Sequence, residues 1–359
     1  MEGVRYRHLQ DFETPRIVRL DHNLHAAAFF LMKLLPARFI LERAFERGEL
    51  SASTHICETS SGTFGLALAM LAARMDNRLT IVSDWAIDAK LKSRLIDLGA
   101  EVEIVTLPGA KGGLQQARLD RLQAILSRST SAYWPRQYEN PDNPRSYSEV
   151  AARLVERIGQ IDCLVGTVGS GGSLCGTARY LRLIFPELKV IAVDTMNSVL
   201  FGQPDATRLI RGLGGSVIPN NIDHTQIDEV HWLSAAEIFH ATRQLHGRTG
   251  LFMGPTSGAA FKVATWWACH NRTASVAVLM PDEGHRYIET AYDEGWLDTN
   301  LPHWRDPPRL QPSGANDPWE EFDHWTRFDW ARRSRADVLG RNDPFEKVTS
   351  NLSSGERSE

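Results

Sequence analysis

Short apolar runs rich in β-branched residues alternate along the chain with longer amphipathic stretches. The runs have the length and composition of buried strands, and the stretches between them have the apolar spacing of helices. This alternation is typical of a parallel α/β sheet that is covered on both faces. The predicted strands are 78–84, 101–107, 162–168, 188–194 and 274–280, and the predicted helices are 63–74, 86–98, 114–127 and 147–158.

The pattern changes after Leu301, where a stretch rich in proline and polar residues is typical of a linker. The segment 318–338 then carries the aromatic residues Trp319, Phe322, Trp325, Phe328 and Trp330. Their spacing of mostly three predicts one face of a helix that packs on the chain's own core or on a second subunit. A specialised recognition element is the alternative. The last residues, 350–359, have the composition of a disordered tail.

Composition sets limits on the function. The chain has 359 residues, 42% hydrophobic and 23% charged, which is typical of a soluble globular protein and favours two lobes. Its formal net charge of -4 argues against nucleic acid or an anionic membrane as the main partner. The N-terminus lacks the apolar core of a signal peptide, and no segment approaches the roughly 20 apolar residues that span a bilayer.

The chain contains 4 cysteines, and none of them form a CxxC pair, so a zinc site or a thioredoxin-like motif finds no support. Cys57 and Cys163 lie in apolar runs and are predicted to be buried. This cysteine usage predicts a reducing cytoplasm.

A glycine-rich loop follows the predicted strand 162–168 and opens a helix at Ser173. Such a loop turns backbone N–H groups toward one point beside a helix N-terminus, which is a cradle for a phosphate. The loop has no Walker lysine, and Leu174 breaks the GxGxxG pattern, so a monophosphate is favoured over a nucleotide. A merely structural turn is the alternative. The loop residues are Gly169, Ser170, Gly171, Gly172 and Ser173.

Two further runs of small hydroxylated residues precede helices. Ser60, Ser61, Gly62 and Thr63 have the composition of a turn that binds a substrate carboxylate, with a helix N-cap by Ser60 or Ser61 as the alternative. The run 252–259 has the same character. Because open α/β sheets bind ligands at the carboxyl ends of their strands, we expect all three turns to converge on one site.

Together these runs resemble fold-type II pyridoxal-phosphate (PLP) enzymes of the cysteine synthase and cystathionine β-synthase group, over about 12–296. The similar motifs are TSSGTFGLALA (59–69), QYENPDNP (137–144), GSGGSLCG (169–176), GLGGSVIP (212–219), GPTSGA (254–259) and PDEGHRYIET (281–290). Within the group, LMKLLPARFILERA (31–44) and SVLFG (198–202) resemble synthases of the N-(1-amino-1-carboxyl-2-ethyl)-glutamate type. Those enzymes join O-phospho-L-serine to L-glutamate as a precursor of 2,3-diaminopropionate for siderophores. MGPTSGA and HRYIETAYDEGWL are shared with cysteine desulfhydrase-like relatives.

The resemblance implies a tryptophan synthase β-like α/β fold with two lobes, each built on a mostly parallel sheet flanked by helices. Residues 1–35 and 146–300 would form the large cofactor-binding lobe, and 36–145 the smaller, mobile substrate lobe. Residues 301–359 would add the linker, the Trp-rich helix and the tail. The family also implies a homodimer that takes a small amino-acid substrate.

The resemblance also assigns roles to single residues. Lys33 would form the Schiff base with PLP and act as the general base, although a lone lysine in an apolar run is ordinarily a snorkelling surface residue. Apolar neighbours would lower its pKa. The cofactor site would add Thr63, Gly169, Ser170, Gly171, Gly172, Ser173 and Thr256, and the substrate site would hold Ser60, Ser61, Gly62, Gln137, Arg211 and Gly212. Arg211 is a candidate for binding a substrate phosphate, with a solvated surface arginine as the alternative.

Two departures from the family are visible: the chain between Thr14 and Lys33 is several residues shorter, and Thr63 replaces an asparagine. A neutral Thr256 hydroxyl at the pyridine nitrogen would favour chemistry at the β-carbon. We therefore expect a PLP-dependent transferase that carries out β-replacement on O-phospho- or O-acetyl-L-serine with an amine or sulfide. β-Elimination, as in a desulfhydrase or a serine/threonine dehydratase, and a non-catalytic protein of the same fold are the alternatives.

Overall fold

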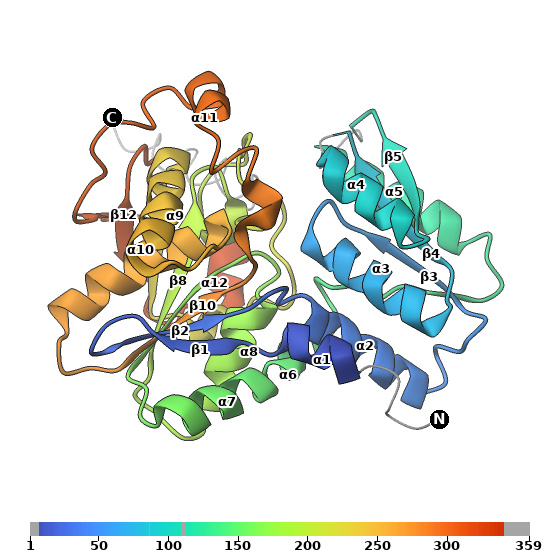
Figure 1. Ribbon diagram of the computed structural model, residues 1–359, viewed down its shortest axis with the longest axis horizontal. Coiled ribbons are helices and arrows are strands. Elements are labelled where there is room, and N and C mark those ends of the chain that lie inside the picture. The colour runs from blue at the N-terminus through green and yellow to red at the C-terminus, as the bar shows by residue number, and fades with distance from the viewer. Residues whose placement is uncertain (1–6, 86, 109–112, 341–359) are drawn as a thin grey trace, which may run out of the picture.

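Two β-sheets organise the chain in the computed structural model, which describes residues 7–85, 87–108 and 113–340 (Figure 1). The larger sheet has the order β1-β2-β10-β7-β8-β9-β12-β11, and the smaller has the order β5-β4-β3-β6. The large-sheet strands are β1 (Arg16–Arg19), β2 (Leu24–Ala28), β7 (Cys163–Thr167), β8 (Lys189–Thr195), β9 (Glu229–Leu233), β10 (Val276–Met280), β11 (Ser313–Gly314) and β12 (Thr326–Asp329). The small-sheet strands are β3 (His55–Thr59), β4 (Leu79–Asp84), β5 (Glu101–Val105) and β6 (Ala132–Tyr133).

Helices cover both sheets. They are α1 (Arg7–Glu13), α2 (Leu34–Glu46), α3 (Thr63–Met75), α4 (Ala89–Asp97), α5 (Gly113–Leu126), α6 (Asp142–Ser146), α7 (Ser148–Ile158), α8 (Gly172–Leu181), α9 (Ala235–Thr249), α10 (Pro255–His270), α11 (Glu294–Asn300) and α12 (Arg335–Gly340). Short 3₁₀ turns are η1 (Val199–Phe201), η2 (His224–Gln226) and η3 (Gly284–Tyr287). None of the helices in the described parts of the chain is long and apolar enough to cross a membrane.

Strand alternation places side chains in separate layers. In β7, Leu164 joins the cluster that α7 and α8 cover, whereas Cys163 and Val165 join the cluster under α9 and α10. In β3, Ile56 packs with α2 and α3, and Cys57 packs with Leu122 of α5 on the other face. Cys57 and Cys163 are both buried, as predicted.

The predicted strands and helices are confirmed, with shifts of a few residues at their ends. The small sheet is parallel throughout, and the large sheet is parallel except where β2 pairs with β1 and β9 with β12. The strands of the small sheet fall within 55–133, inside the predicted smaller lobe, and Figure 1 shows the two sheets side by side. The short segment before Lys33 still holds the antiparallel hairpin β1–β2. The mobility of the smaller lobe stays a prediction.

The prediction of a Trp-rich helix at 318–338 is wrong. Here the chain forms β12, which pairs antiparallel with β9, and only α12 is helical. Trp325 packs under α9 and α10, while Phe328 and Trp330 pack on the opposite side of the sheet. Side chains at odd separations thus lie on opposite faces, as the two-residue period of a strand requires. Residues 301–317 contribute β11 to the same sheet and so are more than a linker. The predicted tail, 350–359, lies outside the described residues.

A buried polar relay fixes β12 to β9. Nε1–H of Trp325 donates to Nδ1 of His231 at 2.9 Å, so the other ring nitrogen of His231 carries the proton that meets Glu229 at 2.7 Å. Lys189 pairs with the same carboxylate at 2.9 Å. Burial works against the ionised form of Glu229, but His231 and Lys189 lower its pKa to about 2. The relay therefore gives hydrogen-bond partners to the buried side chains of His231 and Glu229 on β9.

Trp325→Phe tests this relay because it keeps an aromatic ring and removes only the indole N–H. His231 is 0% exposed, so its Nδ1 becomes a buried acceptor without a donor, at a cost of about 1–3 kcal/mol. We expect urea denaturation to show a loss of that size. Trp85→Phe, at a side chain that is 66% exposed, is the control, and equal losses for the two variants would contradict the relay.

Candidate active site

A cavity of about 490 Å³ opens between the two sheets, at the carboxyl ends of β3, β4, β7 and β10. It brings together most of the residues that were predicted for the site. Gly171 and Gly172 are the exceptions, because they shape the glycine-rich turn without lining the cavity. The predicted residues in the lining are Lys33, Ser60, Ser61, Gly62, Thr63, Gln137, Gly169, Ser170, Ser173, Arg211, Gly212 and Thr256.

Lys33 lies at the N-terminal end of α2, where β2 leaves the large sheet. The backbone just before it is anchored to the end of β10, since Met32 N–H donates to the carbonyl of Pro281 at 2.8 Å. The half-buried Lys33 side chain turns inward, and its Nζ donates to Oγ of Ser170 at 3.2 Å. Burial lowers the pKa of Lys33 to about 8. This geometry is that of an amine held in a site and not of a snorkelling surface lysine.

The glycine-rich loop joins β7 to α8. Gly171 has φ +82°, a conformation that side chains disfavour. A Cβ on Gly172 would lie 2.1 Å from Oδ1 of Asn143, so this glycine is required by packing. The first turn of α8 directs N–H groups without intrahelical partners toward the loop, which suits an anion.

Asn143 of α6 braces this loop. It is 0% exposed, and its Nδ2 donates to the carbonyl of Gln137 at 2.6 Å and to Oγ of Ser170 at 3.4 Å. One side chain thus joins the phosphate cradle to the segment beginning at Gln137. The motif QYENPDNP contains Asn143, but nothing in its sequence indicates this contact.

The turn 60–63 leads from β3 into α3. Oγ of Ser60 accepts from the N–H of Gly62 at 3.2 Å and from the N–H of Gly65 at 3.1 Å. Ser60 therefore holds the turn and also lines the cavity, but the N-cap of α3 is Gly62, so the prediction of an N-cap by Ser60 or Ser61 is wrong. Ser61 and Thr63 line the same part of the cavity.

Thr256 lies in the first turn of α10, opposite Asp282. Thr256 and Asp282 both line the cavity, and Tyr287 donates to the Asp282 carboxylate at 2.8 Å. Asp282 is 5% exposed, and burial raises its pKa. The role of Thr256 as a neutral partner of the pyridine nitrogen stays a prediction. The structure adds a carboxyl group behind the hydroxyl, which sequence reasoning missed although Asp282 lies in the motif PDEGHRYIET.

Arginines surround the outer part of the cavity. Arg118 of α5 is 8% exposed and lies 3.2 Å from Asp84, and its Nε has no hydrogen-bond partner among the described residues. Arg211 is exposed at the rim, where it both lines the cavity and meets solvent. Arg208 is committed to Ser216 and to nearby backbone carbonyls. Sequence reasoning missed Arg118 because a lone arginine on a helix carries no signal.

Comparisons with known proteins found a matching family model and similar proteins. The family model described as "Pyridoxal-phosphate dependent enzyme" matches residues 26–280. The chain is 36% identical over 268 residues to the N-(2-amino-2-carboxyethyl)-L-glutamate synthase of Cupriavidus metallidurans, covering 73% of this chain and 79% of that protein. It is 36% identical over 267 residues to the synthase of the same name from Ralstonia nicotianae, covering 73% and 78%.

Solved structures show the same fold. The O-acetylserine dependent cystathionine beta-synthase from Helicobacter pylori matches with a TM-score of 0.69 and 27% identity, over 78% of this chain and 92% of that one. A hydrogen sulfide-producing enzyme from Fusobacterium nucleatum matches with a TM-score of 0.72 and 24% identity, over 80% of this chain and 100% of that one.

The residues of the cavity fit pyridoxal phosphate. The partly desolvated amine of Lys33 suits an aldehyde, the N-terminus of α8 with Ser170 and Ser173 suits a phosphate, and Thr256 offers a hydroxyl for the ring nitrogen. The contact between Lys33 and Ser170 shows that amine and cradle face the same space.

Lys33→Ala is expected to abolish the visible absorption band of lysine-bound PLP and the adduct that borohydride traps, while the circular dichroism of the fold stays unchanged. Lys90→Ala is the control, because Lys90 is exposed and paired with Glu289. A borohydride-stable adduct in the Lys33 variant would assign the cofactor to another lysine.

Gly172→Ala is expected to weaken PLP binding by about 10-fold or more, since the new methyl group would displace Asn143, whose Nδ2 holds Oγ of Ser170 in the phosphate cradle. Equilibrium dialysis of the cofactor measures the effect. Gly247→Ala is the matched control, because a Cβ at Gly247 meets nothing within 4 Å. Unchanged affinity in the Gly172 variant would show that this turn is not the cradle.

Proposed function

We propose that the substrates of this enzyme are O-phospho-L-serine and an amine, with L-glutamate as the first candidate for the amine. The chain belongs to the pyridoxal-phosphate dependent enzyme family and carries out β-replacement on an activated serine. The names of the two synthases from Cupriavidus metallidurans and Ralstonia nicotianae support the product class. The observation that carries the choice of phosphate is the buried guanidinium of Arg118 in the cavity.

A buried arginine needs anionic partners, and Asp84 supplies only one. A guanidinium binds phosphate with two parallel hydrogen bonds, and Arg118 lines the cavity with an Nε–H that is buried without a partner among the described residues, so it suits a phosphate that enters the cavity. Arg211 at the rim adds a second positive charge on the same side. This anion site is separate from the cradle at Gly169–Ser173, which the cofactor phosphate would fill. O-Acetylserine makes no use of such a site.

Bound PLP would supply the electron sink that makes the Cα proton of the substrate acidic. The chain's own residues would do the rest. The turn 60–63 and Gln137 would hold the substrate carboxylate, and Arg118 with Arg211 would bind the phosphate as it leaves Cβ. Lys33, whose pKa burial lowers, would take the proton from Cα and return it after the amine has added to Cβ.

The homodimer and the cytoplasmic location are likewise proposals. Exposed apolar side chains on the large lobe support a partner surface, among them Phe12 at 40%, Phe30 at 37% and Leu183 at 77% exposure. Buried, unpaired cysteines support a reducing compartment. Sedimentation velocity would test the first proposal.

Arg118→Lys and Arg211→Ala are expected to raise KM for O-phosphoserine by about 10-fold or more, because each loses a charge-assisted contact, and to change KM for O-acetylserine far less. Steady-state kinetics with both substrates measures the difference. Arg94→Ala, at an exposed position on α4, serves as the control. Equal effects on both substrates, or no turnover of O-phosphoserine by the parent enzyme, would remove the proposal and favour O-acetylserine.

A further inference from the structure

Glu58 is a buried carboxylate directly behind the turn 60–63. It lies near the end of β3 and is 1% exposed. Its Oε1 accepts from the N–H of Thr59 at 2.8 Å and from Nε1–H of Trp134 at 2.9 Å, and its Oε2 accepts from the N–H of Gln137 at 3.3 Å. One side chain therefore joins Thr59, the residue that leads into the turn 60–63, to Gln137.

The contact to Gln137 matters because the backbone of Gln137 is held on its other side too. Its carbonyl accepts from Nδ2 of Asn143 at 2.6 Å and from Nδ2 of Asn221 at 3.0 Å. Glu58 binds the N–H of the same residue. The position of Gln137 relative to the turn 60–63 thus depends on the carboxylate of Glu58.

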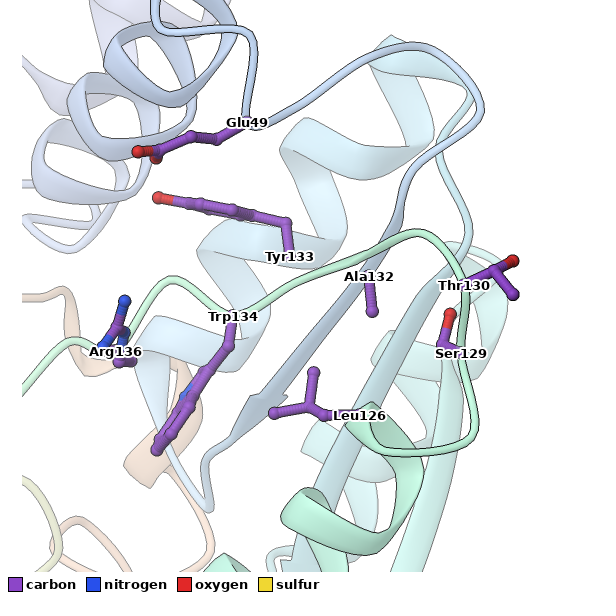
Figure 2. A pocket seen from close by; sticks show the side chains of 8 residues that line it. All are labelled: Glu49, Leu126, Ser129, Thr130, Ala132, Tyr133, Trp134 and Arg136. Carbon is purple, nitrogen blue, oxygen red and sulfur yellow. The ribbon is translucent and has the colours of Figure 1, made fainter.

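Trp134 supports Glu58 from the protein surface. Figure 2 shows its ring along the wall of an open groove on the smaller lobe, near Tyr133 and Arg136. The guanidinium of Arg136 lies 5.8 Å from the centre of the Trp134 ring. The indole N–H of Trp134 donates to Glu58, and Glu58 in turn binds the N–H of Gln137, which lines the cavity. A residue that lines the surface groove is thus connected to the cavity.

The charge state of Glu58 decides whether these contacts can coexist. A carboxylate accepts all the surrounding N–H groups, whereas the protonated acid places an O–H among donors. Burial raises the pKa of Glu58 to about 7, against the hydrogen bonds that favour the ionised form. The neighbouring titratable groups are Cys57 and Tyr138, whose pKa values burial also raises, and Arg118 acts on Tyr138. Glu58 is therefore the group that changes charge there near neutral pH.

We propose that Glu58 is a positioning residue whose carboxylate holds the turn 60–63 and Gln137 in register for the substrate carboxylate, with Trp134 as its support. The inference rests on the proposed role of these two segments in binding the substrate. It does not depend on which leaving group the serine carries.

Glu58→Gln and Trp134→Phe test the proposal in the PLP-loaded enzyme. The amide that replaces the carboxylate turns one donor toward the N–H of Gln137, so we expect KM for the activated serine to rise about 10-fold with kcat nearly unchanged. Trp134→Phe removes only the indole N–H, and we expect a rise of about 3-fold in the same parameter. Besides the titration of Lys33, the parent kcat/KM should fall further as the pH drops through about 7, where Glu58 becomes protonated, and Glu58→Gln should lack this second component.

Matched controls separate positioning from loss of stability. Glu13 is also a buried carboxyl group with a pKa raised to about 7 by burial, but it pairs with Arg38 on α2. Glu13→Gln should keep the parent KM and pH profile, and Ser129→Ala, which changes the groove away from Glu58, should do the same. If the Glu58 variant fails to fold, Trp134→Phe still decides the question.

Unchanged KM in both test variants, or an equal change in the Glu13 variant, would overturn the proposal. The assay uses O-acetylserine and O-phosphoserine in parallel. Failure of O-phosphoserine alone would therefore count against the proposed substrate, whereas an unaltered KM for the accepted serine would count against Glu58.

Discussion

The packing of Asn143 against the glycine-rich loop is the constraint on which the rest of the site depends. Its amide bridges Gln137 and Ser170, and Ser170 in turn accepts from Lys33. The space for that amide exists only because Gly172 has no side chain. The helix α6, which carries Asn143, is thereby held to the glycine-rich loop. The distance between the amine and the substrate-binding turn follows from this single junction.

Charge is distributed unevenly around the cavity. The outer part has the guanidinium groups of Arg118 and Arg211, whereas Asp282 lies behind Thr256 in the inner part. Between them, Lys33 carries an amine that burial makes easier to deprotonate. Such separation would orient the proposed anionic substrate before any chemistry begins, with its phosphate toward the arginines and its amino group toward Lys33. The positive charges of Arg118 and Arg211 would disfavour a cationic amine as the first substrate to enter.

Sequence patterns predicted the parts of this structure that depend on local periodicity or on motif order. The buried parallel strands, the helix after the glycine-rich loop and the presence of Lys33 and Ser170 in one site belong to this class. The Trp-rich segment was misassigned because a spacing of three fits a helix, while pairing with the open edge of β9 imposed a period of two. Glu58, Arg118 and Asn143 were missed because their significance arises only from contacts across long sequence separations.

The hydrogen bonds of Glu58 also bear on how the smaller lobe would move. The turn 60–63 and Gln137 come from opposite ends of that lobe's sequence, separated by three of its strands. Without a shared partner, rotation of the lobe would shift the two segments independently and change the shape of the carboxylate site during closure. Because Glu58 binds both Thr59, just before the turn, and Gln137, the two segments would travel as one unit. Closure would then vary the distance from the substrate to Lys33 while leaving the grip on its carboxylate constant, which is what a proton transfer at Cα requires.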